Sequence, residues 1–499
     1  MRAARSAHRE AFALAAIVLA AAAIRLATAA YPLWFDEIAS TVFAHQPVTR
    51  LWSGWMARES NPPLYYTLLR GWIAVAGESD VALRALSVAI GLVGMVAAWG
   101  TARRLGGAAA GLAAAALLAV SAAHVDTSQA VRGYALAHSA ALVAIWALIA
   151  FLEGRRWPAL LGYAVAATVA LYAHTTMVVF VALATPFLLW TIREDRRALA
   201  QASIATAGIA LAWAWWGWIS LRQALAAHSN FGWIARPDLG DGWATVEQAY
   251  LPGYLFSGGL SADLLLLMFV AALGWIVWRD RRPPILLLAL LSIGTPLLLF
   301  AVSQIVPILL VRTLYWASGP AIVLFAVAVT AMRPPRLGWI VLFAVLAFET
   351  AALVHWLPQR SIERWAPAMR ALGSIGADGD VLLVQGDAVA LAAAHYRMLA
   401  PHLRIVALTP PSGGFDHWAD GLYDGPHVDP AGACTLLKRR NRLFALVRGD
   451  HDPGKILRGA GFGRVLSGLT DDRQPYIWLW SSRAAGTSAP SGPNPCRPR

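Results

Sequence analysis

Long apolar runs separated by short polar breaks fill the first 357 residues of the chain. A helix needs roughly 20 apolar residues to cross the hydrocarbon core of a bilayer, and eleven runs come close to that length. They lie at 11–30, 81–102, 107–124, 134–152, 158–174, 175–192, 199–221, 259–278, 285–305, 314–331 and 337–357. This pattern predicts an α-helical polytopic membrane protein with about 11 transmembrane helices.

The pattern changes after residue 357. Buried strands are expected at Val381–Val384, Leu443–Val447 and Tyr476–Trp480, with helices near 361–373, 387–398 and 453–460. Their alternation predicts a small α/β domain over 358–484, followed by a flexible tail over 485–499. Residues 1–357 then form the membrane module. Its first external loop, 31–80, contains two amphipathic segments that are expected to lie along the membrane interface.

Composition narrows the class of protein. Hydrophobic residues make up 58% of the chain and charged residues 14%, with a mean hydropathy of +0.55. Ordinary soluble domains carry about 25% charged residues, so these values exclude a disordered chain, a secreted disulfide scaffold and a simple soluble enzyme. The two cysteines, Cys434 and Cys496, lack metal-ligand spacing, and a disulfide between them stays open.

The net charge of +13 reflects arginines that gather in alternate breaks between the apolar runs. They lie at Arg2, Arg5, Arg9, Arg103, Arg104, Arg155, Arg156, Arg193, Arg196, Arg197, Arg279, Arg281, Arg282, Arg333 and Arg336. The positive-inside rule places these segments in the cytoplasm. The N-terminus is then cytoplasmic and the C-terminal domain extracytoplasmic, at the cytoplasmic (inner) membrane of a bacterium whose genome is GC-rich, since Arg far outnumbers Lys. This placement also argues against nucleic acid as a partner. Residues 1–30 fit a cleaved signal peptide as well, which would leave the later topology unchanged.

Asp36 and Glu37 directly follow the first run, in the sequence Tyr-Pro-Leu-Trp-Phe-Asp-Glu. Carboxylates so close to hydrocarbon are costly unless water or a partner stabilises them, so one interpretation is an acidic pair that marks the water boundary. In the other, the neighbouring aromatic residues partly desolvate Asp36 and raise its basicity, which suits a general base. Adjacent residues on a helix do not share a face, so Glu37 is expected to orient a neighbour instead.

Further candidate residues lie on the external side. Arg132 and Arg312 each precede an apolar run, and such side chains either reach to lipid headgroups or form a guanidinium fork for a lipid phosphate. His174 lies at an external hairpin, and Asn61 opens an Asn-Pro-Pro turn. No second His or acid near His174 has metal-ligand spacing. The sequence therefore indicates no metal site and no certain cofactor, while a divalent metal stays open.

These residues together resemble a known family. The Asp36–Glu37 pair, the Pro62-Pro63-Leu64-Tyr65-Tyr66 element and the Arg132-Gly133-Tyr134 motif are similar to motifs of membrane glycosyltransferases that use lipid-phosphate sugars. The chain specifically resembles the protein O-mannosyltransferase and aminoarabinose transferase superfamily, of GT-C architecture (glycosyltransferase family 39-like). Residues 34–136 carry most of the likeness, and the segment 311–315 adds a weaker one.

The resemblance implies an inverting enzyme that moves a sugar from a polyprenyl phosphate, such as undecaprenyl phosphate, to a hydroxyl of a lipid, glycan or protein acceptor. Asp36 would be the general base that deprotonates the acceptor, with Glu37 as its partner. Arg132 and Arg312 would bind the donor phosphate. The remaining candidates for substrate binding are Asn61, Tyr65, Tyr134 and His174.

Two departures and two alternatives bear on this interpretation. Asn61 stands where the aminoarabinose branch has a lysine, and no segment fits the extra β-trefoil domain of the protein-mannosylating branch, so neither acceptor is indicated. A transporter or flippase for a polyprenyl-linked glycan is the main alternative, but such proteins usually show repeats and polar mid-span residues. A non-catalytic scaffold would leave Asp36, Glu37 and Arg132 without a role.

Overall fold

The structure, a computed structural model, describes residues 2–225, 234–251, 260–360, 363–409, 417–429, 432, 442–448, 463–467 and 476–481. Contacts divide the chain into two compact units. The first unit contains residues 1–30 and 47–360, and the second contains residues 31–46 and 361–499. The segment 31–80, which was expected to be one external loop of the membrane module, is therefore divided between the two units. Its first part, which carries Asp36 and Glu37, packs with the C-terminal residues.

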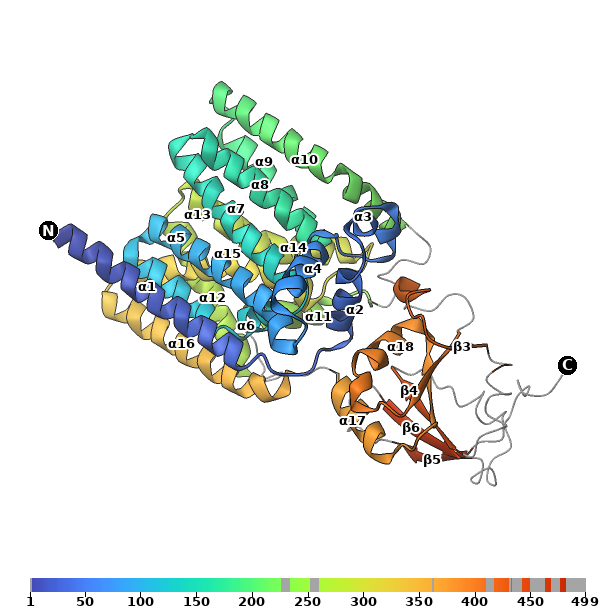
Figure 1. The fold of residues 1–499 in the computed structure, drawn as a ribbon. Helices are drawn as coiled ribbons and strands as arrows, with labels where there is room; N and C mark the ends of the chain where they lie inside the picture. Colours follow the sequence, from blue (N-terminus) through green and yellow to red (C-terminus); the bar gives the residue numbers. More distant parts are fainter. Residues whose placement is uncertain are drawn as a thin grey trace. The chain divides into compact units, whose positions relative to one another are not determined.

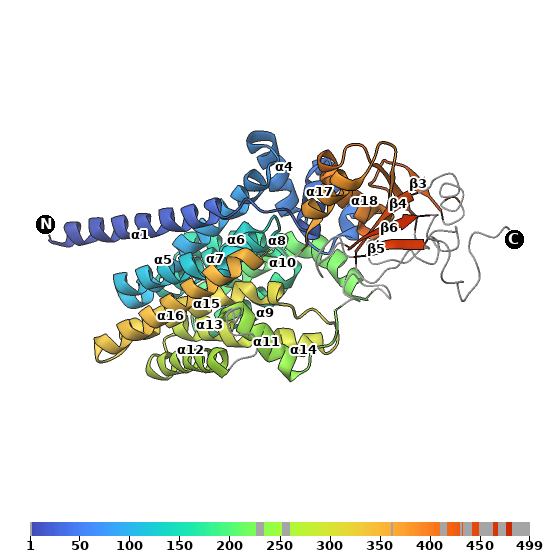
Figure 2. The ribbon, with the colours of Figure 1, turned by 90° about the horizontal axis from the view of Figure 1, so that it is seen from below.

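The first unit is a bundle of helices (Figures 1 and 2). Its elements are α1 (Arg2–Ala27), α3 (Val48–Leu51), η1 (Gly54–Arg58), α4 (Leu64–Ala76), α5 (Asp80–Val120), α6 (Ala122–Gln129), α7 (Tyr134–Gly154), α8 (Trp157–Ala173), η2 (Thr175–Met177), α9 (Val178–Thr191), α10 (Arg196–Leu225), α11 (Leu239–Tyr250), α12 (Leu260–Arg279), α13 (Pro283–Ala289), η4 (Leu290–Gly294), α14 (Thr295–Ser303), α15 (Val311–Ala331), α16 (Pro335–Trp356) and η5 (Leu357–Gln359). Each predicted apolar run falls largely within these helices.

Among the described residues, seven helices are long and apolar enough to cross a membrane, and three shorter apolar helices accompany them. The 41-residue α5 contains the second predicted run and most of the third, and Gly107 interrupts it with a φ of 83°. Glycine adopts this left-handed conformation without the steric cost that a side chain would bring. The predicted multi-pass helical membrane architecture is confirmed.

Helix α15 lies at the centre of the bundle. It packs against α5, α7, α12 and α16, and almost all of its residues are buried. A helix that is apolar on all sides is expected in such a position. The central place of α15 matters for function because Arg312 is the second residue of this helix.

Small residues allow α5 and α7 to approach each other closely. A methyl group added to Gly94 of α5 would lie 2.5 Å from the Oγ of Ser139 on α7 and 2.9 Å from its Cα. Contacts this short would force the two helix backbones apart. By contrast, a methyl group added to Gly208 of α10 would meet no atom within 4 Å.

We therefore expect Gly94→Ala to lower the stability of the protein by about 1–3 kcal/mol, the usual cost of overpacking. Gly208→Ala should leave stability unchanged or raise it slightly, because alanine is the better helix former. Thermal unfolding of both variants in lipid nanodiscs measures the difference. Equal midpoints for the two variants would contradict the close approach of α5 and α7.

The second unit combines helices with a sheet (Figure 1). Its helical elements are α2 (Phe35–Ala44), α17 (Trp365–Ile375), α18 (Gly386–His395), η6 (Arg397–Leu399) and η7 (His417–Ala419). Its strands are β1 (Val381–Gln385), β2 (Arg404–Leu408), β3 (His427–Val428), β4 (Arg442–Val447), β5 (Gly463–Ser467) and β6 (Tyr476–Ser481). The described strands are ordered β3-β2-β1-β4-β6-β5. β1 is parallel to β2 and β4, β3 is parallel to β2, and β6 runs antiparallel to β4 and β5.

The three strands predicted from the sequence are confirmed as β1, β4 and β6, and with them the small α/β domain. The residues of β1 from Val381 to Val384 are buried on both faces, as the apolar runs of central parallel strands predict. Helix α18 packs against β1 and β2 (Figure 2). The predicted helix at 453–460, the tail 485–499 and both cysteines lie outside the described residues.

Candidate active site

Asp36 and Glu37 lie in the first turn of α2. Glu37 is fully buried, and its Oε2 accepts a hydrogen bond from the backbone N–H of Trp34 at 3.2 Å, as the glutamate of a capping box does. Asp36 is only half-buried, and its negative charge lies at the positive end of the helix dipole. The two acids therefore differ in accessibility: Glu37 is buried and holds the start of the helix, whereas Asp36 is partly exposed.

Arg132 lies between α6 and α7 and is almost wholly buried. Its Nη1 donates a hydrogen bond to the hydroxyl of Tyr66 on α4 at 3.2 Å, and its Nη2 lies 3.6 Å from Oε1 of Glu59. The same Glu59 oxygen accepts hydrogen bonds from the backbone N–H and the side-chain amide of Asn61, at 3.1 and 2.9 Å. Asn61 thus orients Glu59, and Glu59 and Tyr66 together fix the guanidinium group of Arg132.

His174 connects the two arginines that the sequence predicts for phosphate binding. It occupies the turn between α8 and η2, and its ring centroid lies 5.4 Å from that of Tyr134, the first residue of α7. The His174 side chain is buried, and the charges of Arg132 and Arg312 both act on its imidazole. We call Glu59, Tyr66, Arg132, Tyr134, His174 and Arg312 the His174 cluster.

Tyr65 does not join this cluster directly. Its side chain is buried, and its hydroxyl shares a hydrogen bond with Ser87 of α5 at 2.8 Å. Its ring meets that of Tyr66 edge-on, with the centroids 6.2 Å apart. Tyr65 therefore links α4 to α5 and packs against the ring of Tyr66, whereas the hydroxyl of Tyr66 accepts a hydrogen bond from Arg132.

Glu59 is a member of the cluster that the sequence analysis missed. It is 7% exposed although it is a carboxylate, and its contacts to Asn61 and Arg132 explain why burial is tolerated. One signal was present in the sequence: Glu59 is the only acid between Glu37 and Glu78, and it stands beside the Asn-Pro-Pro turn. Its partner Arg132 lies 73 positions further along the chain, so spacing alone could not pair them.

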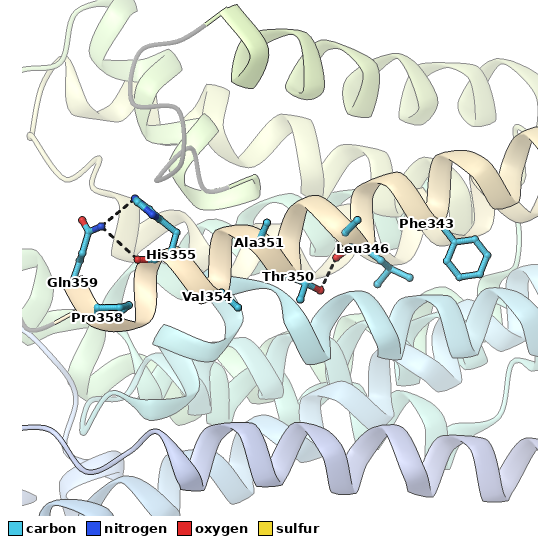
Figure 3. Close-up of a pocket in the computed structure, with 9 residues that line it drawn as sticks. Phe343, Leu346, Thr350, Ala351, Val354, His355, Pro358 and Gln359 are labelled. Carbon is cyan, nitrogen blue, oxygen red and sulfur yellow. Dashed lines mark hydrogen bonds between the residues drawn. The ribbon is translucent and has the colours of Figure 1, made fainter.

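No grouping of three or more His, Cys, Asp or Glu side chains that could hold a metal ion occurs within the described ranges. A groove of about 910 Å³ runs along α16 (Figure 3). Its walls are mostly apolar, and it ends at Gln359, whose amide nitrogen lies 3.0 Å from Nε2 of His355. None of the predicted site residues lines this groove, so the His174 cluster and α2 remain the candidates for chemistry.

A match to a known sequence family covers much of the candidate site. Residues 60–218 match the sequence family described as dolichyl-phosphate-mannose-protein mannosyltransferase. This range contains Arg132, Tyr134 and His174 but ends before α15. No curated protein sequence matches the chain significantly.

Several solved structures have a fold similar to that of this chain. ArnT from Cupriavidus metallidurans in the apo state superimposes with a TM-score of 0.63 at 13% identity, over 97% of this chain and 100% of that chain. The same protein bound to undecaprenyl phosphate gives a TM-score of 0.60 at 12% identity, over 97% and 98%. The oligosaccharyltransferase of Archaeoglobus fulgidus gives 0.52 at 11% identity, over 87% and 68%. At such identities the likeness establishes a shared fold.

Residues 60–218 match a family named for glycosyl transfer, and the chain as a whole has the GT-C fold of ArnT. The likeness to ArnT extends along nearly the whole chain. The resemblance predicted from residues 34–136 is therefore confirmed, and with it the predicted multi-pass helical fold.

Proposed function

We propose that this protein transfers a sugar from a polyprenyl phosphate to a hydroxyl group of a lipid, glycan or protein acceptor, at the outer face of a bacterial cytoplasmic membrane. The observation that carries the proposal is the buried guanidinium group of Arg132, fixed by Tyr66 and Glu59 beside His174, on which the charge of Arg312 also acts. The match of residues 60–218 to a lipid-phosphate-sugar-dependent family supports the same donor class.

A phosphate explains the charges of the His174 cluster. Two guanidinium groups that act on one ring repel each other, and the cluster contains one carboxylate, that of Glu59, against their two positive charges. A bound anion would lower this repulsion further, and guanidinium groups bind phosphate oxygens with paired hydrogen bonds. Because the cluster belongs to the membrane unit, a lipid-borne phosphate is the anion we infer. The ArnT structure that contains undecaprenyl phosphate supports this choice.

The chemistry we propose is a single displacement. Asp36 takes the proton of the acceptor hydroxyl, and the oxygen attacks the anomeric carbon of the sugar. The bond between that carbon and the phosphate oxygen breaks, and polyprenyl phosphate leaves with the electron pair. Arg132 and Arg312 stabilise the charge that develops on the leaving phosphate. Attack opposite the leaving group inverts the anomeric configuration.

The other predicted residues take supporting places in this proposal. Tyr134 and His174 line the phosphate end of the cluster, and Asn61 acts through Glu59. The sidedness of the arginines supports a position of the cluster outside the cytoplasm, where nucleotide sugars are absent. A lipid-linked sugar satisfies that constraint because the lipid carries the sugar across the membrane.

The neighbouring tyrosines of α4 provide a matched pair of variants. Tyr66→Phe removes the acceptor for Arg132, and since such a hydrogen bond contributes about 0.5–1.5 kcal/mol, binding of undecaprenyl phosphate should weaken about 2- to 10-fold. Tyr65→Phe removes a hydroxyl that bonds Ser87, so we expect lower thermal stability with affinity retained. Equilibrium binding of undecaprenyl phosphate to the full-length protein in nanodiscs tests both. The reverse pattern would make Tyr65 the substrate-facing residue.

The experiment that tests the function is mass spectrometry of envelope lipids, glycans and proteins from the source organism with and without this gene. We expect one species to lose a single hexose or pentose, and the wild-type gene to restore it. That result would identify sugar and acceptor together. Accumulation of an unflipped lipid-linked glycan, with no species lacking one sugar, would support a flippase instead.

A further inference from the structure

The side chain of Glu363 contacts the first residue of α2, the helix that carries Asp36. The side chain is 5% exposed, and its Oε2 accepts a hydrogen bond from the backbone N–H of Phe35, the first residue of α2, at 2.8 Å. The same oxygen accepts from Nε1 of Trp365 at 2.6 Å, and Oε1 accepts from Nε of Arg448 at 3.0 Å. One buried carboxylate therefore joins α2 to two separate parts of the C-terminal domain.

Helix α2 needs this acceptor. The first N–H groups of a helix have no partner within the helix, and the residue before α2 is Trp34, whose indole offers a donor but no acceptor. Glu363 supplies the missing acceptor from 328 positions away, and its charge lies at the positive end of the helix dipole. The start of α2 is thus capped by the C-terminal domain and, through Glu37, by the helix itself.

Other contacts hold the residues on either side of Trp34. The hydroxyl of Tyr396 lies 2.7 Å from the backbone nitrogen of Leu33, and the guanidinium carbon of Arg448 lies 3.9 Å from the ring centroid of Phe35. The rings of Phe35 and Trp365 are stacked, with centroids 6.0 Å apart. The backbone that leads directly into Asp36 is therefore fixed by side chains of the C-terminal domain.

We propose that Glu363 is a positioning residue for Asp36, and that the C-terminal domain belongs to the catalytic apparatus because it holds the base in place. This inference rests on the proposed role of Asp36 as general base. Glu363 bonds the amide one residue before Asp36, so its loss would let the first turn of α2 shift. A displacement of about 1 Å at a catalytic group lowers rates by as much as 10²-fold.

The test compares Glu363→Ala and Glu363→Gln with Asp387→Asn in the full-length protein. Asp387 is a matched control because it is a buried acid of the same domain, bonded to the Gly421 N–H at 2.7 Å and to His427 at 2.6 Å. Transfer rates are measured in membranes of the deletion strain, using the product that the envelope comparison identifies. Hydrogen exchange of the amides in α2 is measured on the purified variants.

We expect Glu363→Ala to lower the transfer rate about 10- to 100-fold and to speed amide exchange in α2, with binding of undecaprenyl phosphate unchanged. Glu363→Gln keeps an acceptor oxygen and should recover part of the rate, while Asp387→Asn should match wild type. In a protein that already carries Asp36→Asn, Glu363→Ala should have no further effect on the rate, because it acts through Asp36.

Two results would overturn the proposal. One is a wild-type rate for Glu363→Ala with normal exchange in α2. The other is an equal further loss of rate in the Asp36→Asn background, which would mean that Glu363 supports folding in general. Full activity of Asp36→Asn alone is a different outcome, since it would remove the proposed base itself and leave the capping of α2 by Glu363 intact.

Discussion

Replacing Asp36 by Asn is expected to lower the rate of sugar transfer by about 10²–10⁴-fold, the usual contribution of a positioned general base. The substitution conserves size and leaves the α2 backbone contacts in place, but an amide cannot take the proton of the acceptor hydroxyl. Binding of undecaprenyl phosphate should be retained, because the proposed phosphate-binding residues are Arg132 and Arg312. The measurement is the rate of product formation in membranes of the deletion strain, per amount of protein.

Two further acids serve as controls for this prediction. Asp80 also lies in the first turn of a helix and is also half-buried, so Asp80→Asn makes the same chemical change elsewhere in the chain. Glu37→Gln keeps an oxygen that can accept from the Trp34 N–H and should cost far less activity than Asp36→Asn. If Asp36→Asn worked as well as wild type, or if Asp80→Asn were equally damaging, Asp36 would not be the base.

Periodicity along the chain was sufficient to predict the long apolar helices and three of the six described strands, but it missed β2, β3, β5 and α11. The predicted apolar runs form helices, and the three short runs after residue 380 form β1, β4 and β6. These predictions worked because burial imposes a pattern on each helix or strand separately. The sequence did not predict that the segment 31–80 is divided between two units, because this division depends on which distant side chains α2 contacts.

Pairing of residues across the chain marks the limit of prediction from one sequence. Asp36, Arg132 and His174 stood out because charged or polar groups beside apolar runs are conspicuous. Glu363 did not stand out because it lies in an ordinary polar stretch. Its role depends on hydrogen bonds from Phe35 and Arg448, which are both far away in sequence. The sequence analysis chose Tyr65 as the candidate for substrate binding, and only the packing of α4 showed that Tyr65 faces Ser87 and Tyr66 faces Arg132.

The second large effect is expected at Arg132. Arg132→Gln should weaken binding of undecaprenyl phosphate about 10- to 100-fold, because hydrogen bonds to charged groups contribute about 1.5–3 kcal/mol and each 1.4 kcal/mol is a factor of ten. Arg132→Lys keeps the charge but loses the planar fork, so an intermediate affinity is expected. Arg104→Gln is the control, since its pair with Glu153 is well exposed and such pairs contribute about 0–1 kcal/mol.

A loss of affinity at Arg132 must be separated from damage to the fold, because Arg132→Gln leaves the buried carboxylate of Glu59 without its cation. The double variant Glu59→Gln/Arg132→Gln removes both charges and should recover thermal stability. It should not recover affinity, since the guanidinium group that we assign to the phosphate is still missing. Recovery of both quantities together would show that Arg132 serves only to balance Glu59, and the donor phosphate would then depend on Arg312.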